Sequence, residues 1–271
     1  AIEYVQTWGV QGRSEGGVGE QSGKTQDRGE VVPATDCVVA CASVAPKGNE
    51  KYVALTFDEG PSGATKQILQ VLKEKGVTAT FFLSGDAAEA SPATAKAIVD
   101  AGCEIGSNSY SDDSLKGQDR EAVREQIAKG TDAIKSATGV KTMLLRAPYA
   151  AFDEQNWIDA MDLVSAVVSW NIDSGDWLLN GADEQVSTVL DSVTPGNIVL
   201  LTDRDECAEQ ALEALPQIID GLVADGYKIV TLSDLVKTDT SLSKKLTSLT
   251  KATMPKDAVF PQLAEDDDTT E

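Results

Sequence analysis

The sequence contains no histidine, and its charges are strongly unbalanced, with 23 basic residues against 44 acidic ones and a formal net charge of −21 at pH 7. Without imidazole there is no Ser-His-Asp or Cys-His triad, no histidine ligand for zinc and no imidazole acid or base near neutral pH. The shortage of basic residues argues against a nucleic-acid partner, because no basic stripe can offset phosphate charge. Any chemistry must therefore use carboxylates, Tyr, Lys, Arg, hydroxyls or thiols.

Long hydrophobic runs are also absent. No apolar run approaches the ~20 residues that a membrane-spanning helix needs. The first three residues do not begin a signal peptide, so either there was none or it has been removed. Four cysteines either form disulfides, with three possible pairings if all are oxidised, or serve as small buried residues: Cys37, Cys41, Cys103 and Cys207.

The composition that remains is typical of a globular protein, with 41% hydrophobic and 25% charged residues. We predict a flexible N-terminal leader over 1–50, a folded body over 51–236 and a loose polar tail over 237–271. The leader carries a net charge of −3 and the tail −2, which leaves −16 for the body. The acidity therefore belongs to the folded part, where it permits cations, neutral glycans or basic protein partners.

Short apolar runs alternate with stretches of helical periodicity along the body. Helices are expected at 64–75, from 91 to a glycine at 102, at 120–138 and at 206–224. Strands are expected at 53–57, 79–83, 104–106, 143–146, 166–170, 198–201 and 228–232. This alternation predicts an α/β fold with a parallel sheet, either open or closed into a barrel.

Polar and aromatic residues collect after the carboxyl ends of five of these strands, at 58–62, 107–113, 146–149, 173–177 and 202–205. Binding and catalytic groups of parallel α/β folds lie at this edge. Any one segment could contain only helix caps and turn formers, but five on one rim predict a concave carboxylate cluster. Repulsion between carboxylates requires a proton, a partner such as Arg146 or a bound cation. One carboxylate could then act as a general base on water while others hold a hard metal ion.

Six motifs, in order, resemble the polysaccharide deacetylase (NodB-homology) family over about residues 51–236. They are TFDEGPS from Thr56, ATFFL from Ala79, GCEIG from Gly102, RAPY from Arg146, DSGDW from Asp173 and PGNIVLL from Pro195. The resemblance implies an irregular (β/α) barrel of about seven parallel strands. It also implies hydrolysis of N- or O-acetyl groups on extracellular glycans such as chitin, peptidoglycan or xylan, with a divalent metal.

Part of the family's site is retained. The resemblance assigns the general base to Asp58, the residue that orients it to Arg146, and a place in the catalytic set to Asp176. It assigns substrate binding to Pro61, Tyr149 and Trp177.

The remaining part is replaced, because all three histidines of the family's mechanism are missing. The Asp-His-His metal ligands correspond here to Glu59, Asn108 and Asp112, and the histidine general acid corresponds to Thr202. An all-oxygen ligand set favours Mg²⁺, Mn²⁺ or Ca²⁺ over zinc. Thr202 has no proton of suitable pKa for a leaving group, and losing a general acid typically costs ~10²–10⁴ in rate.

Three functions stay open from the sequence, so whether the chain is an enzyme is also open. The first is a catalytically impaired, deacetylase-like pseudoenzyme of cell-wall metabolism that binds peptidoglycan or a chitin-like oligosaccharide. The second is an active amide hydrolase that deacetylates a glycan with an oxygen-ligated Mg²⁺, Mn²⁺ or Ca²⁺. The third is an acidic interaction protein with a basic protein partner. The resemblance further implies an extracellular or cell-envelope location, with which a membrane tether is compatible.

Overall fold

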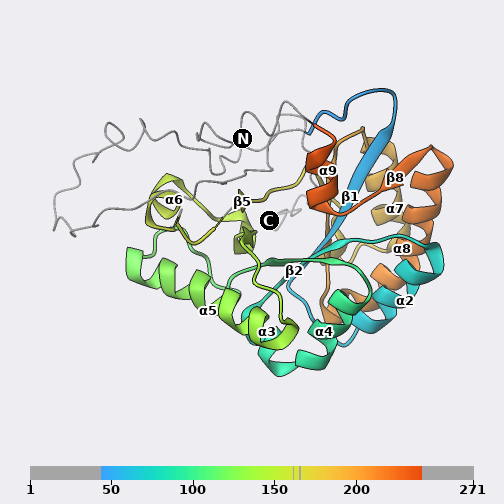
Figure 1. The fold of residues 1–271 in the computed structure, drawn as a ribbon. Coiled ribbons are helices and arrows are strands. Elements are labelled where there is room, and N and C mark those ends of the chain that lie inside the picture. The colour runs from blue at the N-terminus through green and yellow to red at the C-terminus, as the bar shows by residue number, and fades with distance from the viewer. Residues whose placement is uncertain (1–43, 161, 165, 240–271) are drawn as a thin grey trace, which may run out of the picture.

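A curled parallel sheet forms the centre of the molecule, and helices line its outer side (Figure 1). The computed structural model describes residues 44–160, 162–164 and 166–239. The strands follow the order β5-β4-β3-β2-β1-β7-β6, and β8 pairs with the start of β1. Their bounds are β1 Lys51–Asp58, β2 Thr80–Leu83, β3 Glu104–Ser107, β4 Leu144–Leu145, β5 Ala166–Val167, β6 Ile172–Asp173, β7 Ile198–Thr202 and β8 Tyr227–Ile229.

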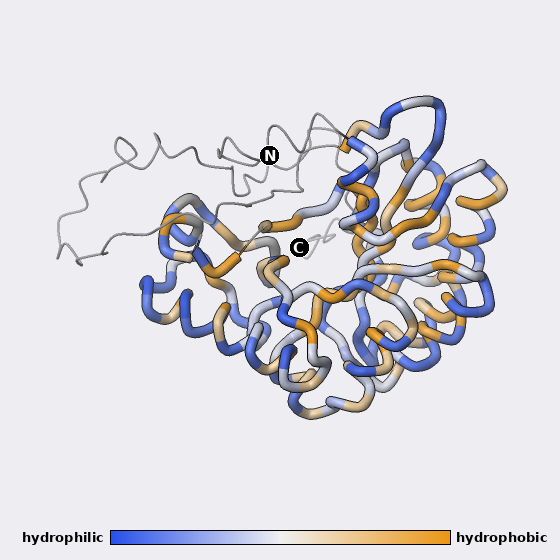
Figure 2. Tube along the Cα trace, viewed as in Figure 1, coloured by the Kyte–Doolittle hydropathy of each residue, from blue (hydrophilic) through white to orange (hydrophobic). Residues whose placement is uncertain are grey.

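The central strands are buried on both faces, and this explains why their sequences are almost continuously apolar. Successive residues point to opposite faces, so Phe81 joins the cluster between sheet and helices, while Phe82 joins the cluster inside the curl. Leu55 and Ala54 divide in the same way. Figure 2 shows the resulting pattern, in which hydrophobic residues lie along the strands, whereas hydrophilic and hydrophobic residues alternate along the helices.

The helices lie around the outside of the sheet, except for the last one, whose Leu232 and Leu235 belong to the cluster inside the curl. They are α2 Thr65–Lys75, α3 Gly85–Ala90, α4 Pro92–Asp100, α5 Arg120–Thr138, α6 Glu154–Ala160, α7 Ala182–Ser192, α8 Ala208–Ala224 and α9 Leu232–Lys237, with 3₁₀ turns η1 Pro148–Ala150, η2 Asp176–Leu178 and η3 Asp205–Cys207. Helix α5 has the predicted bounds, because Asp119 caps its first turn and Gly139 ends it at φ 80°. Helix α8 starts two residues later than predicted, since 205–207 form η3.

The fold prediction is confirmed, and its main correction concerns the predicted strand at 166–170. This stretch holds only β5, and a further strand, β6, follows after four residues. Strand β5 pairs with β4, whereas β6 pairs with β7 at the other end of the sheet. Residues 166–173, here named the closing segment, therefore link the two edges of the curled sheet. The predicted strand at 228–232 ends at Ile229, and Leu232 begins α9.

The two ends of the described part lie together. Val44 is buried, the Ala45 amide donates to Asp239 Oδ2 at 2.9 Å, and the Lys47 amide donates to the Thr238 carbonyl at 3.1 Å. Most of the predicted leader and tail, with Cys37 and Cys41, falls outside the described residues. Cys103 and Cys207 are buried free thiols. Within the described ranges, no helix has the length and apolar character needed to cross a membrane.

Candidate functional site

Arg146, just after β4, lies at the centre of the carboxyl edge with a side chain only 1% exposed. Its Nη1 donates to Thr56 Oγ1 at 2.7 Å and to Asp58 Oδ1 at 2.8 Å. Its Nε and Nη2 donate to the carbonyls of Val168 and Ser169, at 3.3 and 3.0 Å. A single guanidinium thus binds β1 and the bend of the closing segment together.

Asp58 is the carboxylate that Arg146 holds, and its side chain is largely buried. Burial, together with the negative charges of Glu59 and Asp173, raises its pKa to about 6, although Arg146 opposes the shift. The sequence predicted that Arg146 orients Asp58, and the structure brings the two together as a hydrogen-bonded ion pair. A carboxyl group with a pKa near 6 suits general-base work close to neutral pH.

The loop after β1 is fixed by Asp203, which follows β7. The Asp203 amide donates to the Asp58 carbonyl at 2.8 Å, and its carboxylate accepts bonds of 2.6 Å from Ser62 and Thr65. Gly60 is required here, because a Cβ would lie 2.2 Å from Asp203 Oδ2. Pro61, assigned to substrate binding by resemblance, is buried in this loop after a cis peptide bond.

Asp176 and Thr202 form a second buried pair. Asp176 Oδ2 accepts from the Thr202 amide at 2.6 Å, and Oδ1 accepts from Thr202 Oγ1 at 2.9 Å. Burial raises the pKa of Asp176 to about 7, although both Thr202 bonds oppose the shift. Because Asp176 is 0% exposed, its carboxyl group is screened from any ligand, and Thr202 stands at the position where the family resemblance places the acid.

A third cluster joins Glu59 and Asp112 through Arg204, a residue to which the sequence assigned no role. Arg204 Nε donates to Glu59 Oε2 at 2.5 Å, and its Nη2 forms an ion pair with the same oxygen. The same Nη2 lies 4.0 Å from Asp112 Oδ2, which also accepts from the Tyr149 hydroxyl. Burial raises the pKa of Glu59, and Arg204 opposes this shift. The bond to Asp112 raises the pKa of Tyr149 to about 12.

Asn108, the third predicted metal ligand, is engaged elsewhere. It is buried, and its Nδ2 donates to the Arg146 carbonyl at 2.8 Å. The side chain therefore ties the end of β3 to the chain after β4. Its position at the edge was predicted, but this bond was not.

Two aromatic side chains are exposed at the same edge. Tyr149 is 68% exposed, and Trp177, which donates its indole N–H to Asp173 at 3.2 Å, is 44% exposed. Exposed aromatic rings supply flat apolar surface with a polar tip. They are two of the predicted substrate-binding residues, and they lie beside the Asp112 and Asp173 carboxylates respectively.

Two further features set this edge apart. Among the described residues, the non-glycine positions with positive φ all follow strands at the carboxyl edge: Glu59, Ser109, Tyr149 and Leu179. Such conformations are costly and cluster at functional sites. Burial also raises the pKa of five carboxyl groups here, a concentration typical of functional sites: Asp58, Glu59, Asp173, Asp176 and Asp203.

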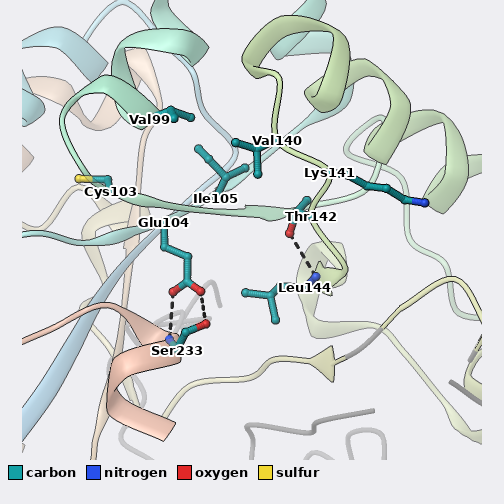
Figure 3. A pocket seen from close by; sticks show the side chains of 9 residues that line it. All are labelled: Val99, Cys103, Glu104, Ile105, Val140, Lys141, Thr142, Leu144 and Ser233. Atoms are coloured by element: carbon teal, nitrogen blue, oxygen red, sulfur yellow. Dashed lines mark hydrogen bonds between the residues drawn. The ribbon is translucent and has the colours of Figure 1, made fainter. Parts of the chain in front are cut away.

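The opposite edge of the sheet holds a cavity of about 390 Å³, near the start of β3 (Figure 3). Glu104 is its acidic residue, and both carboxylate oxygens bond Ser233, at its amide (3.0 Å) and at its hydroxyl. Thr80 Oγ1 donates to the same carboxylate at 3.0 Å. This carboxylate thus fastens the start of α9 to the sheet and has a structural role.

Comparison with known proteins agrees with this geometry. The chain matches the family model described as polysaccharide deacetylase over residues 45–164. It is 32% identical to a peptidoglycan-N-acetylglucosamine deacetylase of Bacillus cereus, over 79% of each chain. It is 36% identical to a bifunctional xylanase/deacetylase of Pseudobutyrivibrio xylanivorans over 69% of this chain, which spans only 31% of that relative. A solved CE4 family pseudoenzyme from Bacillus anthracis has 31% identity and a TM-score of 0.65, covering 69% of this chain and 66% of its own.

The curled parallel sheet with helices around it is the fold that this chain shares with the solved CE4 family protein. The chain belongs to the polysaccharide deacetylase family, a family of carbohydrate and cell-wall metabolism. The resemblance found in its motifs is thereby confirmed.

Deacetylases of this family are metal-dependent, but the residues here do not fit a divalent ion as they are arranged. The guanidinium of Arg204 already binds Glu59, and the Asn108 amide group is directed at a backbone carbonyl. Within the described ranges, no three His, Cys, Asp or Glu side chains gather as a metal site. Metal ligation by Glu59, Asn108 and Asp112 therefore stays a prediction, for which Arg204 would have to move.

Proposed function

We propose that the chain binds an acetylated cell-wall glycan at the carboxyl edge of the sheet and releases acetate slowly or not at all. The proposal rests on the residues that stand at the acid position and at the metal position of the family. A threonine stands at the acid position, and Arg204 binds the carboxylates at the metal position.

Hydrolysis of an amide needs a base for water, a proton for the leaving nitrogen and stabilisation of the oxyanion. Asp58 can serve as the base. Thr202 cannot protonate the leaving group, because a hydroxyl gives up its proton only at very high pH. A guanidinium donates hydrogen bonds and carries charge, but it does not lower the pKa of water as a coordinating metal does.

Glycan binding needs none of these steps. Tyr149 and Trp177 present aromatic surface at the open edge, and sugars and aromatic rings bury apolar surface against one another. The Asp112 carboxylate and the partly exposed Arg204 are polar groups close to Tyr149 that can bond sugar hydroxyls or an acyl oxygen. The edge thus keeps the kinds of group that recognise a neutral glycan.

The relatives support the substrate class. Two of them are named for deacetylation of peptidoglycan N-acetylglucosamine and for xylan-related activity, and a solved neighbour is titled a pseudoenzyme. We accordingly propose peptidoglycan or a chitin-like oligosaccharide as the ligand, and a location at the cell envelope.

The test measures binding and acetate release on the same preparation. We expect acetylated chitooligosaccharide or intact peptidoglycan to bind the full chain, with acetate release far below that of an active family member run in parallel. Acetate release at a rate comparable to that enzyme would overturn the proposal. Activity that is lost with chelator and regained with Mg²⁺, Mn²⁺ or Ca²⁺ would instead establish the alternative of an oxygen-ligated hydrolase.

A further inference from the structure

Arg204 is placed as a cation between two carboxylates that would otherwise repel each other. Its Nε and Nη2 both approach Glu59 Oε2, and Nη2 lies 4.0 Å from Asp112 Oδ2. Glu59 comes from the end of β1, Asp112 from the loop after β3, and Arg204 from the loop after β7. Three separate strand ends thus converge on one guanidinium.

We propose that Arg204 is an internal replacement for the divalent cation of this site, holding Glu59 and Asp112 together and excluding a metal ion. The inference concerns the free protein, so it stands or falls independently of whether a glycan binds. It assigns a role to a residue outside the family's motif positions.

The backbone around Arg204 is fixed, so its placement differs from that of an ordinary surface ion pair. The preceding residue, Asp203, donates its amide to the Asp58 carbonyl and accepts from two side chains of the loop after β1. Glu59 is itself held at φ 75° in that loop, with its amide donating to the Phe82 carbonyl at 3.1 Å. Both partners therefore approach each other from anchored main chain, so pairing them costs side-chain entropy but little further backbone entropy.

Charge explains why a metal and this arginine exclude each other. A divalent ion needs the lone pairs of several oxygens at 2.0–2.6 Å, and the Glu59 oxygen that would supply one already accepts two guanidinium N–H groups. A cation of charge +2 beside a guanidinium would also meet direct repulsion. Binding of a metal thus requires the Arg204 side chain to move away from Glu59. Because the side chain is 39% exposed, it has room to move into solvent, but the move breaks its bonds to Glu59.

Removal of the guanidinium provides the test. We would titrate Mn²⁺ into the full chain and follow the loss of the free Mn²⁺ signal by electron paramagnetic resonance, with calorimetry in parallel. The variants are Arg204→Ala and, as a matched control, Arg124→Ala. Arg124, on α5, forms a two-bond ion pair with Asp162, in the turn after α6, at 2.6 and 2.9 Å, so its removal changes the net charge equally at another place.

We expect Arg204→Ala to bind one Mn²⁺ at least about tenfold more tightly than the wild type, whereas Arg124→Ala binds no better than the wild type. Adding Glu59→Gln to Arg204→Ala should abolish the gain. Arg204→Gln, which keeps a polar side chain as far as the ε position without the charge, serves as a second variant should the alanine variant fold poorly, and the same gain is expected.

Two results would overturn the inference. One is saturable Mn²⁺ binding by the wild type that Glu59→Gln abolishes, because Arg204 would then not exclude the ion. The other is equal Mn²⁺ affinity of the wild type, Arg204→Ala and Arg204→Gln. Neither measurement uses a glycan or detects acetate, so failure here is distinct from failure of the proposed function.

Discussion

The two arginines of the carboxyl edge occupy contrasting surroundings. Arg146 is buried, and it donates to two β1 side chains and two carbonyls of the closing segment. Its guanidinium also lies over the Phe82 ring, with Cζ 4.3 Å from the ring centroid. Arg204 is 39% exposed, and its partners among the described residues are the carboxylates of Glu59 and, at a longer distance, Asp112.

The contrast indicates that Arg146 stabilises the fold, whereas Arg204 determines the charge of the site. Removing a buried guanidinium leaves several buried acceptors without donors, and such losses are large. Removing a half-exposed one leaves its partners to water, and such losses are small. Retention of Arg146 therefore has a structural reason that is independent of catalysis.

Arg146→Ala should give the largest effect. We expect a loss of about 3–5 kcal/mol in the free energy of unfolding, because Asp58 and two backbone carbonyls lose their partner. Urea unfolding followed by circular dichroism measures it, with Arg124→Ala as the control on a partly exposed pair. A loss below that of the control would show that Arg146 does not hold the closing segment.

Asp176→Asn should change how stability depends on pH. The raised pKa of about 7 means that the folded state keeps its proton up to that pH, whereas the unfolded state, in which an aspartate has its ordinary pKa of 3.8, has lost it. Asp176 therefore lowers the free energy of unfolding as pH rises from about 4 to 7, by up to about 1.4 kcal/mol per pH unit. The amide can accept from the Thr202 amide, so the variant should match the wild type near pH 4 and be more stable by roughly 2–4 kcal/mol at pH 8.

Denaturant midpoints of the wild type and of Asp176→Asn at pH 4.5, 6 and 8 provide the measurement. A difference that does not change with pH would mean that the Asp176 carboxyl group titrates normally. Thr202→Val serves as the companion variant, since it removes the hydroxyl bond to Asp176 and keeps the shape of the side chain.

Trp177→Ala and Tyr149→Ala should each weaken glycan binding by about tenfold, or ~1.4 kcal/mol, as aromatic contacts at binding surfaces do. Stability should hardly change, because both rings are exposed. Calorimetry with chitooligosaccharide measures the affinity. Val223→Ala, at an exposed apolar position on α8, is the control and should bind as the wild type does. Equal affinities of all four proteins would remove the aromatic pair from the site.

Arg204→Ala should give the smallest change in stability, below about 1 kcal/mol and reduced further by added salt. The same denaturant series in low and high salt tests this, with Arg146→Ala as the reference. A loss as large as that of Arg146→Ala would erase the distinction between the two arginines.

Local patterns predicted most of the fold. The apolar runs placed seven of the eight strands, and capping residues gave α5 its exact predicted span. The closing segment was misread because its two halves pair with different partners, β4 and β7, and no local pattern encodes that choice. The four residues between β5 and β6, at 168–171, alternate between apolar and polar, which is the pattern of a continuing strand.

The sequence predicted which residues form the candidate site, but not most of the contacts between them. Motif positions placed Asp58 beside Arg146, and the structure has this contact. They put Asp176 and Thr202 on the same edge, but the hydrogen bonds between these two residues were not predicted. The role of Arg204 was missed because its partner Glu59 is 145 residues away in the sequence. The available signal was an arginine that follows one predicted strand and a carboxylate, Glu59, that follows another. Only the tertiary structure shows that these two side chains meet.

The closing segment has a consequence for how this protein behaves at high concentration. Both ends of the described sheet are two-residue strands, β5 and β6, and they belong to one short stretch of chain. Exposed strand edges recruit other chains, and short edges limit that recruitment. The carbonyls of Val168 and Ser169, between the two strands, are occupied by Arg146. A chain in which this arginine is lost would therefore present both sheet ends at once, and we expect it to self-associate through them as well as to unfold more easily.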